Sequence, residues 1–150
     1  MAGAADEVRA LLERVVNALE IEGRVEVSED DEQVIGVVRG EELGLLIGRR
    51  GETIDALQHL AYRRVIQAGV KKRVVVDASG YRDRRAAMLH HDADEAARDA
   101  LRLSRPVALE SMNAAERRVV HEYLRERGEV ETYSEGEEPD RHLVVAPLGT

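Results

Sequence analysis

The sequence predicts an α+β protein with two small domains, and three observations lead to this prediction. Segments in which apolar residues recur at helical spacing alternate with short segments rich in Val and Ile. Both kinds of segment occur on each side of Ser79 and Gly80, a boundary that is too short to be a free linker. The 150 residues, 43% of them hydrophobic, are enough for two small cores. We therefore expect domains over residues 1–79 and 80–150.

The first half is expected to have the element order αββααβ. Its first helix follows from apolar residues three and four apart between Asp6 and Glu22, and Gly23 can end it. An acidic turn at residues 30–32 joins the two strands of a hairpin. The expected elements are a helix over 6–22, strands over 24–29 and 33–39, a short helix over 41–47, a longer helix that follows residues 48–51 and stops near Gly69, and a strand over 72–77.

The second half is expected to open with a long helix over residues 81–103, which Pro106 prevents from continuing. Asn113 and Glu116, three residues apart, predict a capping box at the start of another helix, which stops near Gly128. The remaining expected elements are an extended segment over 107–109 and strands over 129–134 and 142–146, with the acidic loop 135–140 between these strands.

The net charge of −8 is unevenly distributed along the chain. Residues 1–35 contain 3 basic and 10 acidic residues, and residues 126–150 contain 2 and 7. Residues 36–85 instead contain 11 basic and 6 acidic residues, a local charge of +5. A local basic excess is what binding to nucleic-acid phosphates requires, so the acidic total does not exclude it.

Composition also limits the location of the protein and the chemistry open to it. No apolar run approaches the roughly twenty residues of a membrane helix, and the N-terminus lacks the features of a signal peptide. The absence of Cys excludes disulfides, thiol catalysis and cysteine-based zinc sites. We expect a cytoplasmic protein.

Gly48 and Gly51 bracket Arg49 and Arg50 in a turn that opens a helix. Glycines let the backbone turn sharply and approach a ligand, and the unpaired amides at a helix start favour an anion. Arginine suits bidentate contact with phosphate. The Gly-x-x-Gly spacing alone arises about once by chance in a chain of this composition. The aliphatic run before the turn and the arginines inside it favour nucleic-acid binding over a merely structural turn.

Arg117, His121 and Arg125 are four residues apart and are expected to form one polar stripe on a helix that solvent can reach. On this interpretation Ala115, Val119, Val120 and Tyr123 face the core. An arginine with a histidine one turn away can hold a phosphate and contact a sugar or base. A solvated helix face without a ligand is the alternative.

No catalytic or metal centre is expected. His91 and Glu95 lie one helical turn apart, but no third ligand accompanies them at the spacing of a helical metalloenzyme. The serines lack a nucleophile-elbow motif, and the turn at residues 48–51 has neither a Walker sequence nor a dinucleotide fingerprint. We therefore expect no enzymatic activity and no cofactor.

Residues 46–54 resemble the signature of KH domains, and the αββααβ order is similar to the bacterial type II form. The resemblance implies that the glycine turn clamps about four nucleotides of a single strand while bases lie in an aliphatic groove beside it. It assigns the backbone contact to Gly48, Arg49, Arg50 and Gly51, and the groove floor to Ile47 and Ile54, for which a plain core role is the alternative. Glu52 departs from this pattern, because a carboxylate at the helix start competes with phosphate.

Residues 112–121 resemble the Arg-x-x-x-His signature of the R-3-H domain, a small fold that binds single-stranded nucleic acid. Arg117 and His121 match its two defining positions, and the similarity of residues 133–141 to the closing hairpin of that family implies that Arg141 is a third contact. A KH domain followed by this module is similar to the Jag (SpoIIIJ-associated) RNA-binding proteins of bacteria. Many members also carry an N-terminal Jag domain. Because this sequence starts directly at the KH helix, we expect no role that depends on it.

The leading hypothesis is a single-stranded RNA-binding protein that grips one strand at the glycine turn and at the Arg117/His121 face. The resemblance links this role to post-transcriptional regulation and to cell-envelope and cell-division control. Alternatives are an adaptor that pairs with another KH protein or with a second copy, and a single-stranded DNA binder. An enzyme that acts on RNA is the least favoured alternative. No membrane insertion is expected.

Overall fold

The computed structural model of the protein describes residues 3–149. The chain divides into two compact units, Met1–Arg82 and Asp83–Thr150, and each unit has its own hydrophobic core. The expected boundary at Ser79 and Gly80 lies directly before helix α4 (Tyr81–Leu103), whose first two residues belong to the first unit. Within residues 3–149, no helix combines the length and the apolar character needed to cross a bilayer.

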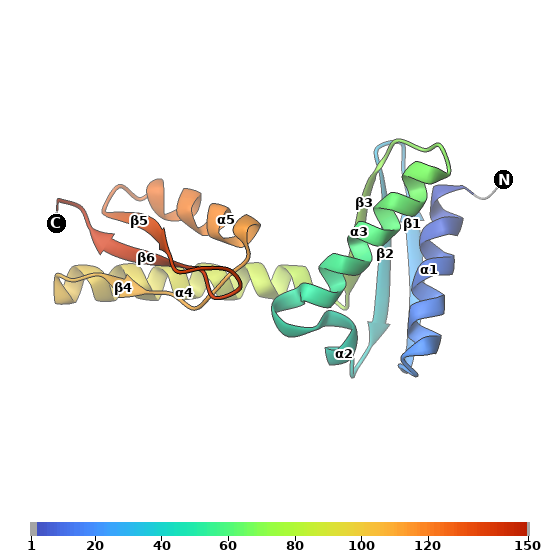
Figure 1. The fold of residues 1–150 in the computed structure, drawn as a ribbon, viewed down its shortest axis with the longest axis horizontal. Coiled ribbons are helices and arrows are strands. Elements are labelled where there is room, and N and C mark those ends of the chain that lie inside the picture. Colours follow the sequence, from blue (N-terminus) through green and yellow to red (C-terminus); the bar gives the residue numbers. More distant parts are fainter. Residues whose placement is uncertain (1–2, 150) are drawn as a thin grey trace. The chain divides into compact units, whose positions relative to one another are not determined.

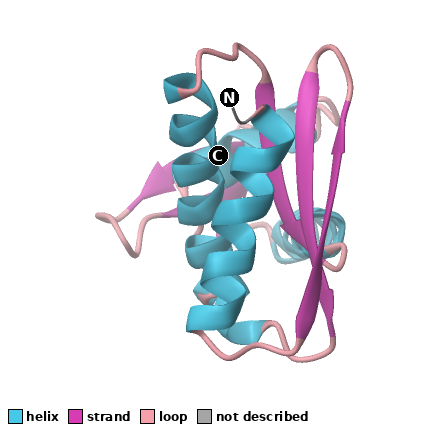
Figure 2. Cartoon of the chain, turned by 90° about the vertical axis from the view of Figure 1, so that its right-hand side faces the viewer, coloured by secondary structure: helices cyan, strands magenta, loops and turns pink. Residues whose placement is uncertain are grey.

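The first unit packs two helices against one face of a three-stranded sheet (Figures 1 and 2). Strands β1 and β2 form an antiparallel hairpin, β2 and β3 run parallel, and the order in the sheet is β1-β2-β3. The elements are α1 (Ala4–Ala18), β1 (Gly23–Glu29), β2 (Gln33–Gly40), α2 (Gly44–Ile47), the single 3-10 turn η1 (Arg49–Gly51), α3 (Glu52–Gln67) and β3 (Arg73–Ala78). This is the expected αββααβ order.

Alternating burial along β2 and β3 shows why the sheet faces the two helices. Val34 and Val38 of β2 and Val74 and Val76 of β3 are buried, and they pack with buried side chains of α1 and α3. Successive strand residues point to opposite faces, so the Val-rich runs present one wholly apolar face to the helices. The position of α3 and of the turn before it is fixed by this packing.

Helix α1 ends at Ala18 rather than at Glu22 as expected. Glu20 adopts a left-handed conformation with φ 53°, and the amides of Glu20 and Ile21 donate to the carbonyls of Asn17 and Val16. These two bonds form a Schellman cap. Glycine usually occupies the left-handed position of that cap. Here glutamate does, so no glycine marks the true end of the helix.

The second unit packs α4 and α5 (Ala114–Arg125) against one face of an antiparallel sheet ordered β4-β6-β5 (Figure 1). The strands are β4 (Val107–Ala108), β5 (Val130–Glu135) and β6 (His142–Pro147). The predicted capping box is confirmed: Asn113 Oδ1 accepts from the Glu116 amide at 2.9 Å, and Glu116 Oε1 accepts from the Asn113 amide at 3.1 Å. The two units together confirm the predicted α+β class.

Candidate nucleic-acid interface

The turn between α2 and α3 has a backbone that requires glycine at both of its ends. Gly48 adopts φ 74° and ψ 176°, a region that is essentially restricted to glycine. A Cβ atom there would lie 2.8 Å from Thr53 Cβ and closer still to the Thr53 hydroxyl. Gly51 adopts φ 78°, and its Cβ would lie 2.8 Å from the Tyr81 ring. Both glycines therefore supply a left-handed backbone and also the space that neighbouring side chains occupy.

The two arginines of this turn are available to a ligand. Arg49 is exposed and Arg50 is partly exposed, and neither guanidinium group takes part in a hydrogen bond or an ion pair within residues 3–149. Arg50 itself has a left-handed backbone, with φ 55°. The turn directly precedes α3, whose N-terminal partial charge favours an anion. The structure thus holds two unpaired guanidinium groups at a fixed turn beside a helix start.

The two isoleucines assigned to the groove floor differ in their surroundings. Ile47 is partly exposed and packs against the core of the first unit. Ile54 has an exposed fraction of 0%. A fully buried side chain presents no surface to a base in this structure, which favours the alternative role of Ile54 as a plain core residue.

A groove that the sequence did not indicate runs beside α3, between this helix and the edge strand β3. Its α3 side comes from residues at helical spacing on one face, Asp55, Gln58, His59, Tyr62 and Ile66. The other side comes from Glu32, Lys71, Lys72, Arg73 and Val74. Eleven residues separate Asp55 from Ile66, which corresponds to about 17 Å along the helix axis. The groove thus follows α3 from its first turn to its last.

The groove offers cations and an aromatic ring rather than the aliphatic lining that the family resemblance implied. Tyr62 is 41% exposed. Lys71 and Arg73 are exposed, and their side chains form no hydrogen bond or ion pair within the described part of the chain. Lys72 is engaged, because its Nζ lies 2.6 Å from Glu29 Oε2 and also donates to the Asp30 carbonyl. An exposed tyrosine beside free cations suits stacked bases and a phosphate backbone.

Side chains cap the edge strand in this groove and so fix its shape. The Val76 amide donates to Gln58 Oε1 at 3.0 Å, and the Val76 carbonyl accepts from Arg82 Nε at 2.8 Å. Arg82 Nη1 also donates to Asp55 Oδ1 at 2.8 Å. Because these groups satisfy the outward-facing backbone of Val76, the edge at this residue is closed to strand pairing with another chain.

In the second unit, Arg117 does not lie on a reachable stripe as we had expected. It is 8% exposed. Its Nη1 donates to the Met112 carbonyl at 2.5 Å and lies 3.5 Å from the Arg141 carbonyl, while Nη2 donates to Glu138 Oε1 at 2.6 Å. The reason is the direction of the helix core face, which Val120 and Leu124 define and which includes Arg117.

The exposed stripe of α5 contains Arg118, His121 and Arg125, at helical spacing of three and four. Arg118 and Arg125 are exposed, and Arg118 forms only a long i, i+4 contact, 3.8 Å, with Glu122. His121 is partly exposed, and its Nδ1 is hydrogen-bonded to the Thr132 hydroxyl. That bond leaves Nε2 as the ring nitrogen for a ligand. Ala115 and Val119, which we expected in the core, are exposed, whereas Val120 is buried and Tyr123 is partly buried.

Arg141 is partly exposed and donates from Nη1 to the Gly136 carbonyl at 2.7 Å, so it braces the loop between β5 and β6.

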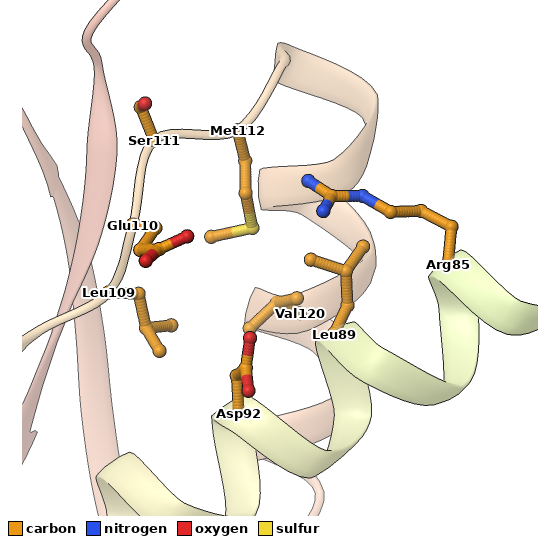
Figure 3. A pocket seen from close by; sticks show the side chains of 8 residues that line it. All are labelled: Arg85, Leu89, Asp92, Leu109, Glu110, Ser111, Met112 and Val120. Atoms are coloured by element: carbon orange, nitrogen blue, oxygen red, sulfur yellow. The ribbon is translucent and has the colours of Figure 1, made fainter. Parts of the chain in front are cut away.

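A cavity of about 20 Å³ lies close to the start of α5, between α4, residues 109–112 and Val120 (Figure 3). Met112 and Leu89 point into it, and Arg85 lies at one side. This volume holds about one water molecule and excludes a nucleotide.

His91, Asp92 and Glu95 bring one possible ligand atom each to within 4.8 Å of one another. Asp92 supplies the third group that sequence spacing did not indicate. His91 and Glu95 are exposed, and exposed acidic side chains commonly gather without an ion, so we assign no metal to this cluster.

Two family models match the chain, one for each unit. A model described as KhpA/KhpB, KH domain matches residues 5–77, and a model for the R-3-H domain, the module named above, matches residues 87–147. These ranges contain the glycine turn and the Arg117/His121 helix, respectively.

Several proteins named RNA-binding protein KhpB are similar to this chain. The protein of Clostridium symbiosum is 36% identical over 144 residues, which cover 94% of this chain and 65% of the relative. The protein of Bacillus subtilis is 33% identical over 93% of this chain and 69% of the relative. That of Lactiplantibacillus plantarum is 42% identical over 69% of this chain and 32% of the relative. The chain therefore spans between 32% and 69% of the length of these relatives.

Proposed function

The chain belongs to the KhpB family of proteins with a KH and an R-3-H domain, and from this premise we propose that it binds single-stranded RNA. The observation that carries the proposal is the glycine turn, where the side chains of Arg49 and Arg50 are unpaired among the described residues and directly precede α3. The names of the relatives support RNA as the ligand. A cytoplasmic location and a role in post-transcriptional regulation accompany this proposal.

We propose a path for the strand within the first unit. The turn at residues 48–51 holds the phosphate backbone, and the strand continues along α3 toward Lys71 and Arg73, with Tyr62 as a stacking surface. A groove of about 17 Å is compatible with the four or so nucleotides that a KH domain contacts. In the second unit, the exposed Arg118 and Arg125 and the Nε2 atom of His121 provide further contacts. Two sites in one chain raise the effective concentration of a strand bound at either.

The test measures binding of the full chain to a fluorescent oligo(U) RNA of about 20 nucleotides. Changing both Arg49→Asp and Arg50→Asp should weaken binding about 10- to 100-fold and lower the slope of log affinity against log salt by about 1.4, for two lost contacts to a single strand. The matched control changes Arg14→Asp and Arg98→Asp, two exposed arginines without a partner among the described residues. If the turn variant is folded and binds as tightly as the control, the assignment is wrong.

Three alternatives can be tested with the same protein. DNA of the matching sequence, used as a competitor, tests whether the 2′-hydroxyl matters; equal competition would favour a general single-strand binder.

An adaptor that pairs with another KH protein or a second copy is motivated by Leu45 and Leu60, which are 65% and 51% exposed in the first unit. Crosslinked partners that survive nuclease treatment at full yield would favour this adaptor, including a link to cell-envelope or division control. RNA cleaved by concentrated protein with Mg²⁺ would point to an enzyme instead.

A further inference from the structure

The guanidinium group of Arg117 has one fixed side and one movable side. On the fixed side, Nη1 donates to the Met112 carbonyl. Met112 is itself held, because its side chain is 3% exposed and packs with Leu89 and Val120 (Figure 3). The movable side is Nη2, which contacts Glu138 at 2.6 Å. The Glu138 side chain is 57% exposed and belongs to the loop between β5 and β6.

Glu138 differs from the other acids of its loop. Among residues 3–149, the carboxylates of Glu135, Glu137 and Asp140 form no ion pair. The Glu137 carbonyl accepts from the Asp140 amide at 2.8 Å, so the loop closes as a turn that carries Glu138 toward the helix. The pair is thus specific to Glu138, although the whole loop is acidic.

A carboxylate and a phosphate use the same donor on arginine. Both accept charge-assisted hydrogen bonds from the planar guanidinium, so Glu138 occupies the place that a phosphate oxygen would take at Nη2. The exposed Glu138 carboxylate is hydrated when it moves into water, and a phosphate that takes its place keeps the buried Arg117 guanidinium paired. Arg117 cannot follow it, because Met112 and the core hold it in place.

We propose that Glu138 is an internal competitor that covers a phosphate site at Arg117, so that RNA gains this contact only when Glu138 swings outward. The inference rests on the proposed RNA-binding function and deepens it for the second unit. The phosphate would enter from the solvent side of the loop and replace the carboxylate at Nη2, while the bond to Met112 stays in place.

The test compares Glu138→Gln with Glu137→Gln in the full chain, with the same fluorescent oligo(U) RNA. Both changes remove one negative charge from the loop, but only the first releases Arg117. We expect Glu138→Gln to tighten binding about two- to five-fold, because the RNA phosphate no longer has to displace a carboxylate from Nη2. Glu137→Gln should give a smaller gain. Thermal unfolding of both variants checks that the loop change leaves the fold intact.

Each outcome decides the proposal. Equal effects of the two variants, or weaker binding by Glu138→Gln, would mean that the pair only fastens the loop. Repeating the comparison in the Arg49→Asp, Arg50→Asp background separates this inference from the assignment of the turn: the gain should persist there, because it arises in the second unit. Binding by neither the wild type nor Glu138→Gln would overturn both proposals, whereas wild-type binding without a specific Glu138 effect would overturn only this one.

Discussion

The arginines of the two candidate contact sites, Arg49 and Arg50 in the first unit and Arg117 in the second, are held in place in opposite ways. At the glycine turn of the first unit the backbone is constrained, with left-handed residues at Gly48, Arg50 and Gly51, and the side chains of Arg49 and Arg50 are free among the described residues. In the second unit Arg117 lies on a regular helix, and its side chain is held by a carbonyl and a carboxylate. The turn thus places Arg49 and Arg50 through its backbone, whereas Arg117 is held through the partners of its own side chain.

The comparison predicts opposite effects of substitutions in the two units on stability and on binding. In the first unit, changing Gly48 or Gly51 should affect stability, and changing Arg49 or Arg50 should affect binding. In the second unit, changing the signature arginine should itself affect stability. The unfolding of each unit can be followed separately in the full chain by methyl NMR. The buried methyl groups of Ile54 belong to the core of the first unit, and those of Leu124 belong to the core of the second.

The largest expected effect is that of Gly48→Ala. The change places a Cβ 2.8 Å from Thr53 Cβ and forces alanine into a backbone region restricted to glycine. Strain and overlap together should destabilise the first unit by about 3–5 kcal/mol. Gly69→Ala is the control, since Gly69 has φ 84° but nothing within 4 Å of a Cβ, and should lose only about 1 kcal/mol. Urea unfolding followed by methyl NMR measures both. Equal losses would show that the turn tolerates a Cβ.

A smaller loss is expected from Arg117→Gln. The change removes the bonds to Met112 and Glu138 and leaves a buried carbonyl without its donor, which should destabilise the second unit by about 2 kcal/mol. Arg125→Gln, on the exposed face of the same helix, should stay within about 0.5 kcal/mol of the wild type. The Leu124 methyl signals during urea unfolding report this difference. A stable Arg117→Gln variant with weakened RNA binding would instead restore Arg117 as a simple contact residue.

Most of the fold was predictable because its signals are local. The alternation of Val residues in β2 and β3, the Asn113–Glu116 capping box and Pro106 each act within a few residues of one another. The end of α1 was misplaced because its cap uses Glu20 in a conformation that sequence associates with glycine. The α+β class and the element order did not depend on that detail.

The candidate site was only partly predictable, because part of it is assembled by tertiary packing. The glycine turn is contiguous in sequence and was found. The α3–β3 groove combines Tyr62 with Arg73 and needs the parallel pairing of β3 with β2 to exist. The helical spacing of Asp55, Gln58, His59 and Tyr62 beside a basic run at residues 71–73 was its available signal. The exposure of Arg117 was predicted wrongly, because a spacing of four does not say where the core face of a helix begins.

The smallest expected effects concern pH, and they too separate the units. In the first unit, Asp30 Oδ1 accepts from the Glu32 and Gln33 amides, which lowers the pKa of Asp30 below 3.8. In the second unit, the Tyr123 hydroxyl donates to Asp94, which raises the pKa of Tyr123 above 10.0. A lowered carboxyl pKa stabilises the fold above pH 3.8, and this contribution is lost as pH falls through the folded value.

A raised tyrosine pKa has the opposite sign: its contribution is complete below pH 10.0 and is lost as pH rises through the folded value. Asp30→Asn should therefore flatten the acid side of the stability profile of the first unit only. Tyr123→Phe should flatten the alkaline side of the second unit only. Urea midpoints of the Ile54 and Leu124 methyl signals across the pH range test both signs. A loss on the same side of neutrality in both units would contradict the hydrogen-bond origin of these shifts.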